Sequence, residues 1–370
     1  MNSFLTVKDV LEIGLNDPVA AARWDELVAP SAQSDIYFRS AYALASAELE
    51  QSQPLGLIIS SSNRRYYLPV LLRSISGPDG QAWFDASSPY GYGGVVCPSP
   101  AELTLPDVVD FFQRLRAWCA TRKLVSCVLR SHPLLAQDWL FAESPDIDFV
   151  SIKRRSQTVA MALQFWDDTR DCPLGMSKGR RSDLSLARRN LRVTWSVLSN
   201  QLETLEQSRV FRNLYESNMR RIGAAEFFHF PWSYYERLST LSPDVGIGIA
   251  WHGDCAVGGA MFMAGPTYSH YHLSGSDEAG HKYKAPTLLV VEGAKWARQR
   301  GCQILHLGGG MHLNDSLLDF KCSFGGERHE FGYVILIVDR GRYNSMCTFA
   351  PTLWPYNQPM ASRVAPGSTA

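Results

Sequence analysis

One lysine of the sequence stands beside a phenylalanine in a short segment after a run of three glycines. The segment reads DSLLDFKCSFG from Asp315 to Gly325, and it contains Phe320 and Lys321. An ammonium group can neutralise a phosphate or carboxylate, or stabilise the oxyanion that develops at a carbonyl during acyl transfer. Lys321 is therefore a candidate catalytic residue, and Phe320 a candidate substrate contact. A solvated helix end with a few ion pairs explains the same segment equally well.

The three glycines follow a short apolar strand, in the run HLGGG that begins at His306. Glycine lets a backbone bend sharply and lets a ligand approach it closely. The run has neither the GxGxxG spacing of a dinucleotide-binding loop nor the Lys-Ser/Thr of a P-loop. His306, Gly308 and Gly309 are therefore candidate substrate-binding residues on backbone shape alone.

Two histidines alternate with other residues just before a possible base. Tyr268, His270 and His272 share one face of a strand, because side chains of a strand alternate between its faces. A His-x-His pair can bind a metal, but nothing in the sequence places a third ligand, so hydrogen-bonded core histidines are favoured and no metal is expected. Asp277 follows the strand, and we take Asp277 or His272 as the base that deprotonates an amine.

A glycine- and tyrosine-rich loop follows an apolar strand in the first half of the chain, with the sequence SPYGYGG from Ser88 to Gly94. Glycines allow a positive φ, and exposed tyrosines offer flat surfaces that end in a hydroxyl group. Tyr90, Tyr92 and Gly93 are candidate substrate-binding residues. Composition alone favours a tight turn with packed aromatic rings.

Basic residues cluster around position 185, where Asp183 is the acidic residue among them. The cluster consists of Lys178, Arg180, Arg181, Arg188, Arg189 and Arg192. Such a cluster on a protein without net charge is either a phosphate-binding patch or a solvated helix face. A Ser-His-Asp hydrolase has no support, because no GxSxG motif occurs.

Composition sets the outer limits of these hypotheses. The chain has 370 residues, of which 45% are hydrophobic and 19% charged, with 36 basic and 36 acidic residues. This is enough apolar material for two domains, and it excludes a mostly disordered chain and a uniformly basic nucleic-acid coat. The 8 cysteines lack CxxC and CxxH spacings, which indicates free thiols in a reducing compartment and no zinc. Without an apolar run long enough for a membrane span or a signal peptide, we expect a cytoplasmic protein.

Hydrophobic periodicity predicts helices and strands in alternation along the whole chain. We expect helices at 38–50, 106–122, 183–192, 203–221 and 286–300. We expect strands at 55–59, 66–72, 124–129, 157–163, 193–198, 246–251, 256–264, 267–273, 304–307 and 331–338. The fold class is therefore α+β, an α/β-layered arrangement made twice, with a boundary in the segment 165–179.

Together these segments resemble the FemABX-type aminoacyltransferases, within the larger group of proteins with two acetyltransferase-like (GNAT) domains. The resemblance covers roughly residues 30–340, and its most specific part runs from Tyr271 to Gly325. There YHLSGSDEAGHKYKAPTLLVVEGAKWARQRGCQILHLGGG and DSLLDFKCSFG follow the family's strand, helix, strand and Phe-Lys order. The SPYGYGG loop is similar to one in the N-terminal halves of less studied members.

The resemblance implies two tandem GNAT-like domains, each a mixed sheet flanked by helices. These are an acceptor-side domain at 1–170, a donor-side domain at 171–345 and a loose tail at 346–370, with the C-terminal end crossing back to the first domain. It also implies transfer of an aminoacyl group from charged tRNA to a small amine, without metal, ATP or other cofactor. The Phe-Lys motif falls on Phe320 and Lys321, so Lys321 would hold an anionic substrate or steady the carbonyl oxygen.

The sequence departs from the peptidoglycan branch of the family in its first half. That branch carries a Gln-Ser-x-x-Trp helix motif leading to a lysine, whereas residues 38–47 read FRSAYALASA with no lysine in reach. An aspartate of that branch is also missing from 90–96. Both departures speak against a nucleotide-linked muropeptide as acceptor, and leave an amino sugar, a peptide or a specialised metabolite.

The donor is the second question that the sequence raises. GNAT enzymes that use acyl-CoA hold its pyrophosphate on a glycine-rich turn before a helix, and the equivalent stretch 280–286, GHKYKAP, lacks that pattern. The basic cluster suits tRNA phosphates, with Arg180, Arg181, Arg188, Arg189 and Arg192 as predicted contacts. Two alternatives remain, an acyl-CoA N-acyltransferase on the same fold and a non-catalytic protein that binds a ligand.

Overall fold

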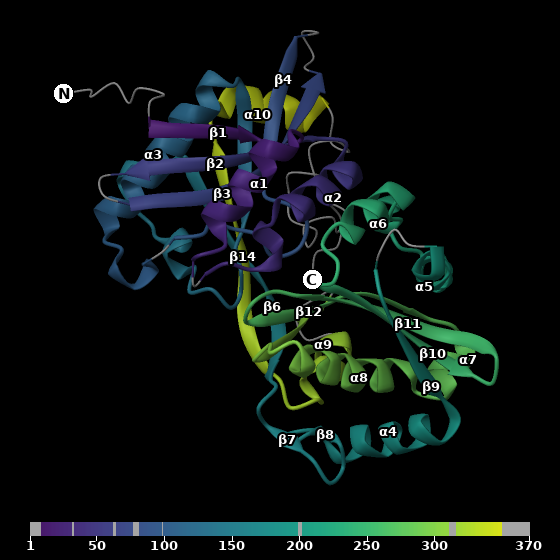
Figure 1. Cartoon of the computed structure of the whole chain (residues 1–370). Coiled ribbons are helices and arrows are strands. Elements are labelled where there is room, and N and C mark those ends of the chain that lie inside the picture. Colours follow the sequence, from purple (N-terminus) through teal and green to yellow (C-terminus); the bar gives the residue numbers. More distant parts are fainter. Residues whose placement is uncertain are drawn as a thin grey trace. The chain divides into compact units, whose positions relative to one another are not determined.

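The structure is a computed structural model, shown in Figure 1. It describes residues 9–31, 33–61, 64–76, 81–97, 99–198, 202–310 and 316–349. Asp315 and most of the predicted tail at 346–370 lie outside the described residues. The chain divides into two compact units, unit 1 with Met1–Ser156 and Glu330–Ala370, and unit 2 with Gln157–His329.

The sheet of unit 1 has the strand order β1-β2-β3-β4-β5-β14. Its strands are β1 (Val10–Gly14), β2 (Gln53–Ser61), β3 (Arg64–Ser76), β4 (Ala82–Ser87), β5 (Leu124–Arg130) and β14 (Glu327–Ile337). The strands from β1 to β4 pair antiparallel, β4 and β5 pair parallel, and β14 is antiparallel to β5. The parallel pair requires a crossover, which helix α3 (Leu105–Thr121) supplies.

Helices cover both faces of this sheet, as the side chains of β2 show. Leu55 and Leu57 lie in one buried cluster with Phe111 of α3. Gly56 between them points to the other face, where a Cβ would lie 2.3 Å from the ring of Trp24 in α1 (Pro18–Val28). Helix α2 (Ser40–Glu50) packs beside α1, and α10 (Arg340–Phe349) packs against β5. Unit 1 is therefore a mixed sheet between two helical layers.

Unit 2 repeats this topology with the strand order β6-β13-β12-β11-β10-β9. Its strands are β6 (Val150–Ala162), β9 (Arg192–Val197), β10 (Val245–His252), β11 (Cys255–Ala264), β12 (Tyr268–Ser276) and β13 (Ile304–Gly309). The strands from β9 to β12 pair antiparallel, β12 and β13 pair parallel, and β6 is antiparallel to β13. The crossover between the parallel strands is α8 (Ala285–Gln299).

The helices of unit 2 also lie on two faces. Gly293 of α8 lies so close to the ring of Phe262 that a Cβ there would be 2.0 Å from it. On the other face, a Cβ at Gly259 would lie 2.9 Å from Phe211 of α5 (Leu202–Arg221). Helix α4 (Lys178–Asn190) packs on α8. The remaining elements of this unit are β7 (Trp166–Asp167), β8 (Cys172–Pro173), α6 (Trp232–Ser239), α7 (Glu278–Lys282) and α9 (Ser316–Cys322).

The predicted α+β class is confirmed, since a mixed sheet flanked by helices occurs twice. The limits of the units differ from the expected boundaries at 170 and 345, because the chain enters unit 2 within β6 and returns to unit 1 within β14. Neither crossing has a turn sequence that would mark it. Helix α4 also begins at Lys178 rather than 183, because the Ser177 hydroxyl caps it by accepting from the backbone N–H of Arg180.

Among the described residues, no helix combines the length and the apolar character that crossing a membrane requires.

Candidate active site

The two parallel strands of unit 2 pair over a short stretch and then separate. Strands β12 and β13 are in register at Tyr268–Ile304, Ser269–Leu305 and His270–His306. Beyond His270, strand β12 continues paired with β11, and beyond His306, strand β13 continues paired with β6. We call the space between 271–276 and 307–309 the fork. Backbone groups along such an opening are suited to hydrogen-bond an extended substrate.

Local irregularities on both sides accompany the separation. The register of β13 on β6 shifts between His306 and Gly308, and that of β11 on β12 shifts between Met261 and Phe262. Gly308 has a φ of +75°, a left-handed conformation that favours glycine. Bulges of this kind bend a strand and increase its twist. The glycine run predicted to bend beside a ligand therefore does form a bend at the fork.

Two buried histidines lie at the base of the fork. The Nδ1 atoms of His270 and His306 are 3.3 Å apart, and their rings meet edge to face. In this hydrogen bond one Nδ1 donates its N–H and the other Nδ1 accepts. His306 was predicted to bind substrate, and the structure places it where β12 and β13 part.

His272 lies further along the fork and is bonded to a tyrosine of α6. The hydroxyl of Tyr234 and Nε2 of His272 are 2.6 Å apart. Burial, and to a lesser extent the neighbouring His270, lower the pKa of His272 to about 3. The imidazole is therefore neutral near pH 7, and Nε2 accepts the tyrosine proton in a hydrogen bond. Tyr234 was not predicted, although it belongs to an aromatic run, FFHFPWSYY, that starts at Phe227.

Lys321 reaches the end of β13 from helix α9. Its ammonium group donates to the carbonyl oxygen of Gly309 at 2.5 Å, and the side chain is buried. The structure thus brings Lys321, Gly308 and Gly309 together at the fork. Phe320, the other half of the Phe-Lys motif, lies instead against the guanidinium group of Arg180, with its ring centre 4.5 Å away.

Asp277 has a clear structural role. Its carboxylate accepts from the backbone N–H of Gly280 at 2.7 Å and caps the short helix α7. The residue is exposed and follows the last residue of β12. Its role as a base stays a prediction, alongside that of His272.

The glycine–tyrosine loop lies in unit 1 and is packed by aromatic rings. The Tyr42 hydroxyl donates to the carbonyl of Tyr90 at 2.8 Å, and burial raises the pKa of Tyr90 to about 12. Tyr92 meets the rings of Tyr37 and Phe331 edge to face, at 5.9 Å and 4.9 Å. Gly93 follows in the turn and is buried. This geometry is the tight aromatic turn that composition favoured, and substrate binding by these residues stays a prediction.

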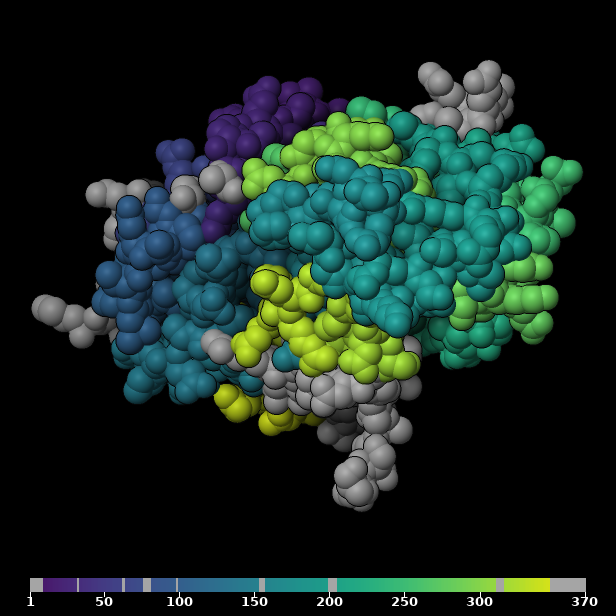
Figure 2. Space-filling view, turned by 90° about the horizontal axis from the view of Figure 1, so that it is seen from below, coloured from purple at the N-terminus to yellow at the C-terminus, as the bar shows by residue number. Residues whose placement is uncertain are grey.

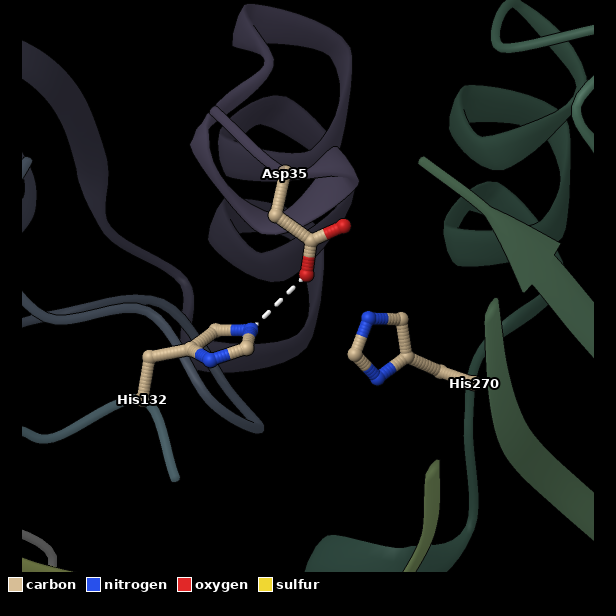
Figure 3. A group of neighbouring side chains, drawn as sticks. All are labelled: Asp35, His132 and His270. Atoms are coloured by element: carbon tan, nitrogen blue, oxygen red, sulfur yellow. Dashed lines mark hydrogen bonds and ion pairs between the residues drawn. The ribbon is translucent and has the colours of Figure 1, made fainter. Parts of the chain in front are cut away.

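An aspartate–histidine pair lies in unit 1 and was not predicted (Figure 3). Nε2 of His132 and Oδ2 of Asp35 are 2.8 Å apart, and both side chains are buried. The backbone N–H of Leu134 donates to Nδ1 at 3.2 Å, so the ring proton is on Nε2 and is donated to Asp35. Asp35 and His132 are far apart in sequence, and no local pattern connects them. Figure 3 also draws His270, which belongs to unit 2.

The basic residues around α4 have different surroundings. Arg188 donates to the carbonyl oxygens of Arg170 and Asp171 at 2.9 Å and 2.7 Å, and Arg181 donates to that of Met176. Arg192 lies over the ring of Trp251. Lys178 and Arg189 are exposed. Teal atoms of this part of the sequence form part of the surface shown in Figure 2.

Comparison with known proteins identifies the class of fold. Residues 178–321, which lie inside unit 2, match the family model described as an acetyltransferase (GNAT) domain. A search of the curated proteins finds no match to the chain.

Solved structures match over most of the chain. A crystal structure of FemX is similar with a TM-score of 0.63 and 13% identity, covering 88% of this chain and 97% of that one. L-PGS from Bacillus licheniformis has a TM-score of 0.55 and 11% identity, covering 88% of this chain and 93% of that one. A tandem GNAT protein from the clavulanic acid biosynthesis pathway has a TM-score of 0.52 and 10% identity, covering 89% of this chain and 98% of that one.

Residues 178–321 therefore form a GNAT domain, which makes the chain an acyltransferase. The repeated topology of units 1 and 2 and the similarity to FemX and to a tandem GNAT protein confirm the FemABX-like, twin-GNAT resemblance at the level of the fold.

Proposed function

We propose that this GNAT-type acyltransferase takes an aminoacyl group from aminoacyl-tRNA and transfers it to an amine, forming an amide. The acceptor is an amino sugar, a peptide or a specialised metabolite. The fold is compatible with an acyl-CoA donor as well, so the proposal depends on what the site offers to each donor.

The start of helix α8 carries the argument for tRNA. The second residue of this helix is Pro286, which has no N–H, and the N–H of Thr287 donates to the carbonyl of Lys284 at 3.1 Å. Gly280 in the preceding helix α7 packs against β11, where a Cβ would lie 2.1 Å from the carbonyl oxygen of Val257. A CoA pyrophosphate needs several free N–H groups at a helix N-terminus. This helix start is a poor cradle for it, which favours a donor without CoA.

The resemblance to the FemABX-type aminoacyltransferases supports the same donor, as does the similarity of the fold to FemX. The exposed basic residues of the α4 region, Lys178 and Arg189, can contact tRNA phosphates.

The proposed reaction is an acyl transfer in which residues at the fork have separate roles. The amine nitrogen attacks the ester carbonyl of the aminoacyl group, the new C–N bond forms, and the C–O bond to the tRNA ribose breaks. The amine loses a proton to Asp277, to the substrate itself or to His272, which is the weaker base because its pKa is lowered and its Nε2 is bonded to Tyr234. The ribose oxygen leaves with a proton. Lys321 exchanges its contact with Gly309 for the developing oxyanion, where a charged donor lowers the barrier.

Such a reaction uses aminoacyl-tRNA as co-substrate and requires no further cofactor or metal. Its partners are charged tRNA and a small amine, which places it in the cytoplasm. Free thiols at Cys97, Cys119, Cys127, Cys172, Cys255, Cys302 and Cys322 are compatible with that reducing compartment.

Binding of bulk aminoacyl-tRNA across a salt series, with CoA as competitor, tests the donor. We expect salt-sensitive binding that CoA does not displace and that Arg189→Gln weakens. Stabilisation of the protein by CoA but not by tRNA would instead support the acyl-CoA alternative. Tight binding of a small ligand, with no transfer from either donor, would support a non-catalytic protein.

A further inference from the structure

We infer that Arg180 is a positioning residue for Lys321, which holds helix α9 in place through its guanidinium group and is not a ligand of tRNA phosphates. The inference rests on the proposed function only in the role given to Lys321. It departs from the sequence-based prediction, which counted Arg180 among the tRNA contacts.

The guanidinium group of Arg180 joins three parts of unit 2. Its Nε donates to the hydroxyl of Ser323, directly after α9, at 3.0 Å. Its Nη1 donates to the hydroxyl of Thr287 in α8 at 3.2 Å and to the carboxylate of Asp183 in α4 at 2.9 Å. These bonds point into the unit, and the side chain is only 20% exposed. These bonds use three of its five N–H groups and leave only the two of Nη2.

The flat face of the same group covers the aromatic residues on either side of Lys321. Its central carbon lies 4.5 Å from the centre of the Phe320 ring and 5.7 Å from that of Phe324. The two rings meet edge to face at 5.1 Å, and Phe324 is fully buried. A guanidinium group over an aromatic face is attracted by the ring quadrupole. Arg180 therefore fixes the residue before Lys321 and a residue one turn after it.

The backbone reinforces this contact at the end of α9. The N–H of Ser177, the capping residue of α4, donates to the carbonyl of Ser323 at 2.9 Å. A Cβ at Gly175 would lie 3.0 Å from the Cα of Gly325, so the two turns touch through their glycines.

Helix α9 needs such support because it is short. It has 7 residues, and isolated helices of that length are unstable in water. Its contacts therefore determine where its side chains point. Lys321 leaves this helix in the direction of Gly309, so a loosened α9 would move the ammonium group away from the fork.

Selective labelling of lysines in the full-length protein tests the inference directly. Arg180→Gln removes the guanidinium group, and Arg180→Lys keeps the charge without the planar fork. Arg189→Gln, on the exposed side of the same helix, is the matched control. Brief exposure to an amine-reactive reagent, followed by mass spectrometry, reports the reactivity of Lys321. Lys295, held by Glu292 and Asp171, serves as internal reference.

We expect both Arg180 variants to raise the labelling of Lys321 several-fold, with Lys295 unchanged. In assays of transfer, kcat should fall about 10- to 100-fold, because a displacement of a catalytic group by about 1 Å is enough for such a loss. The affinity for tRNA and its salt dependence should not change. Arg189→Gln should reduce the salt dependence of tRNA binding and leave the labelling of Lys321 unchanged.

Two results would overturn the inference. One is unchanged labelling of Lys321 in the Arg180 variants together with a weaker salt dependence of tRNA binding, which would make Arg180 a phosphate ligand. The other is increased labelling of Lys321 and Lys295 alike, which would indicate general loosening. If Arg180 variants do not fold, Thr287→Val removes an acceptor of Nη1 that lies outside α9 and must raise Lys321 labelling. If labelling behaves as expected but even the unaltered protein transfers nothing from tRNA, the proposed function fails and the positioning role stands.

Discussion

The ammonium nitrogen of Lys321 lies 2.5 Å from the carbonyl oxygen of Gly309, the last residue of β13. This contact places a buried positive charge at the fork, where β12 and β13 no longer pair. The contact therefore holds the Lys321 side chain beside the opening between the two strands.

Replacing Lys321 by methionine tests this role, because Met keeps much of the apolar stem and removes the charge. We expect kcat to fall about 100- to 1,000-fold, as is typical when an oxyanion donor is removed. Lys123→Met, at an exposed position of unit 1 after α3, is the control and should keep full activity. A folded Lys321→Met variant with full turnover would exclude the role.

Gly308→Ala tests whether the bend of β13 matters for the fork. Gly308 has a φ of +75°, and alanine in that conformation costs about 1 kcal/mol or more of stability. Gly301→Ala is the matched control, since Gly301 has a φ of +79° after α8 and open space around it. Urea unfolding should show similar losses for both variants, while transfer activity falls in Gly308→Ala alone. Equal activities would show that the bend is not needed.

His272 should make unit 2 less stable in mild acid. Burial lowers its pKa to about 3 from an ordinary value of 6.5, so between these values the unfolded chain binds more protons than the folded one. Stability contributed by the neutral imidazole is complete above about pH 6.5 and is lost as the pH falls towards 3. At pH 5 the loss relative to pH 7 is up to about 2 kcal/mol.

Urea unfolding of His272→Gln at pH 7 and pH 5 measures this contribution. The variant should lose less stability between the two values than the unaltered protein does. His252→Gln, an exposed histidine of the same unit, is the control and should behave like the unaltered protein. Parallel losses in all three proteins would contradict a lowered pKa of His272 in the folded protein.

The buried pair in unit 1 should contribute to its stability. Asp35→Ala leaves the Nε2–H of His132 without this acceptor, and a hydrogen bond to a charged group contributes about 1.5–3 kcal/mol. Asp17→Ala, which removes an exposed helix cap, should cost only about 1 kcal/mol. Urea unfolding monitored by tryptophan fluorescence compares the two variants. A smaller loss for Asp35→Ala than for Asp17→Ala would contradict this role.

Periodic segments of the sequence were sufficient for most of the fold. Helix α3 was expected at 106–122 and runs from Leu105 to Thr121, because its apolar residues recur at helical spacing and a capping box starts it. Helix α6 was missed, since its aromatic run has no clear start signal. The crossing of the chain within β6 and β14 also has no local signature, because a strand that passes between units reads like any other strand.

The candidate site was predictable only in part. The Phe-Lys motif and the glycine run are local in sequence, and the structure brings Lys321 to Gly309 as neighbours. Contacts between distant segments could not be predicted, as with Tyr234 and His272. The basic cluster shows a further limit, because residues of one type in one helix have different partners. Arg180 points into the unit and Arg189 is exposed.

The decisive experiment on the proposed reaction is a single turnover without CoA, in which labelled amino acid is transferred from bulk aminoacyl-tRNA to a panel of amines. We expect a labelled amide that resists mild base, whereas the tRNA ester does not, and we expect Lys321→Met to abolish the product. No amide from any charged tRNA, together with amide formation from an acyl-CoA under the same conditions, would contradict the proposed reaction.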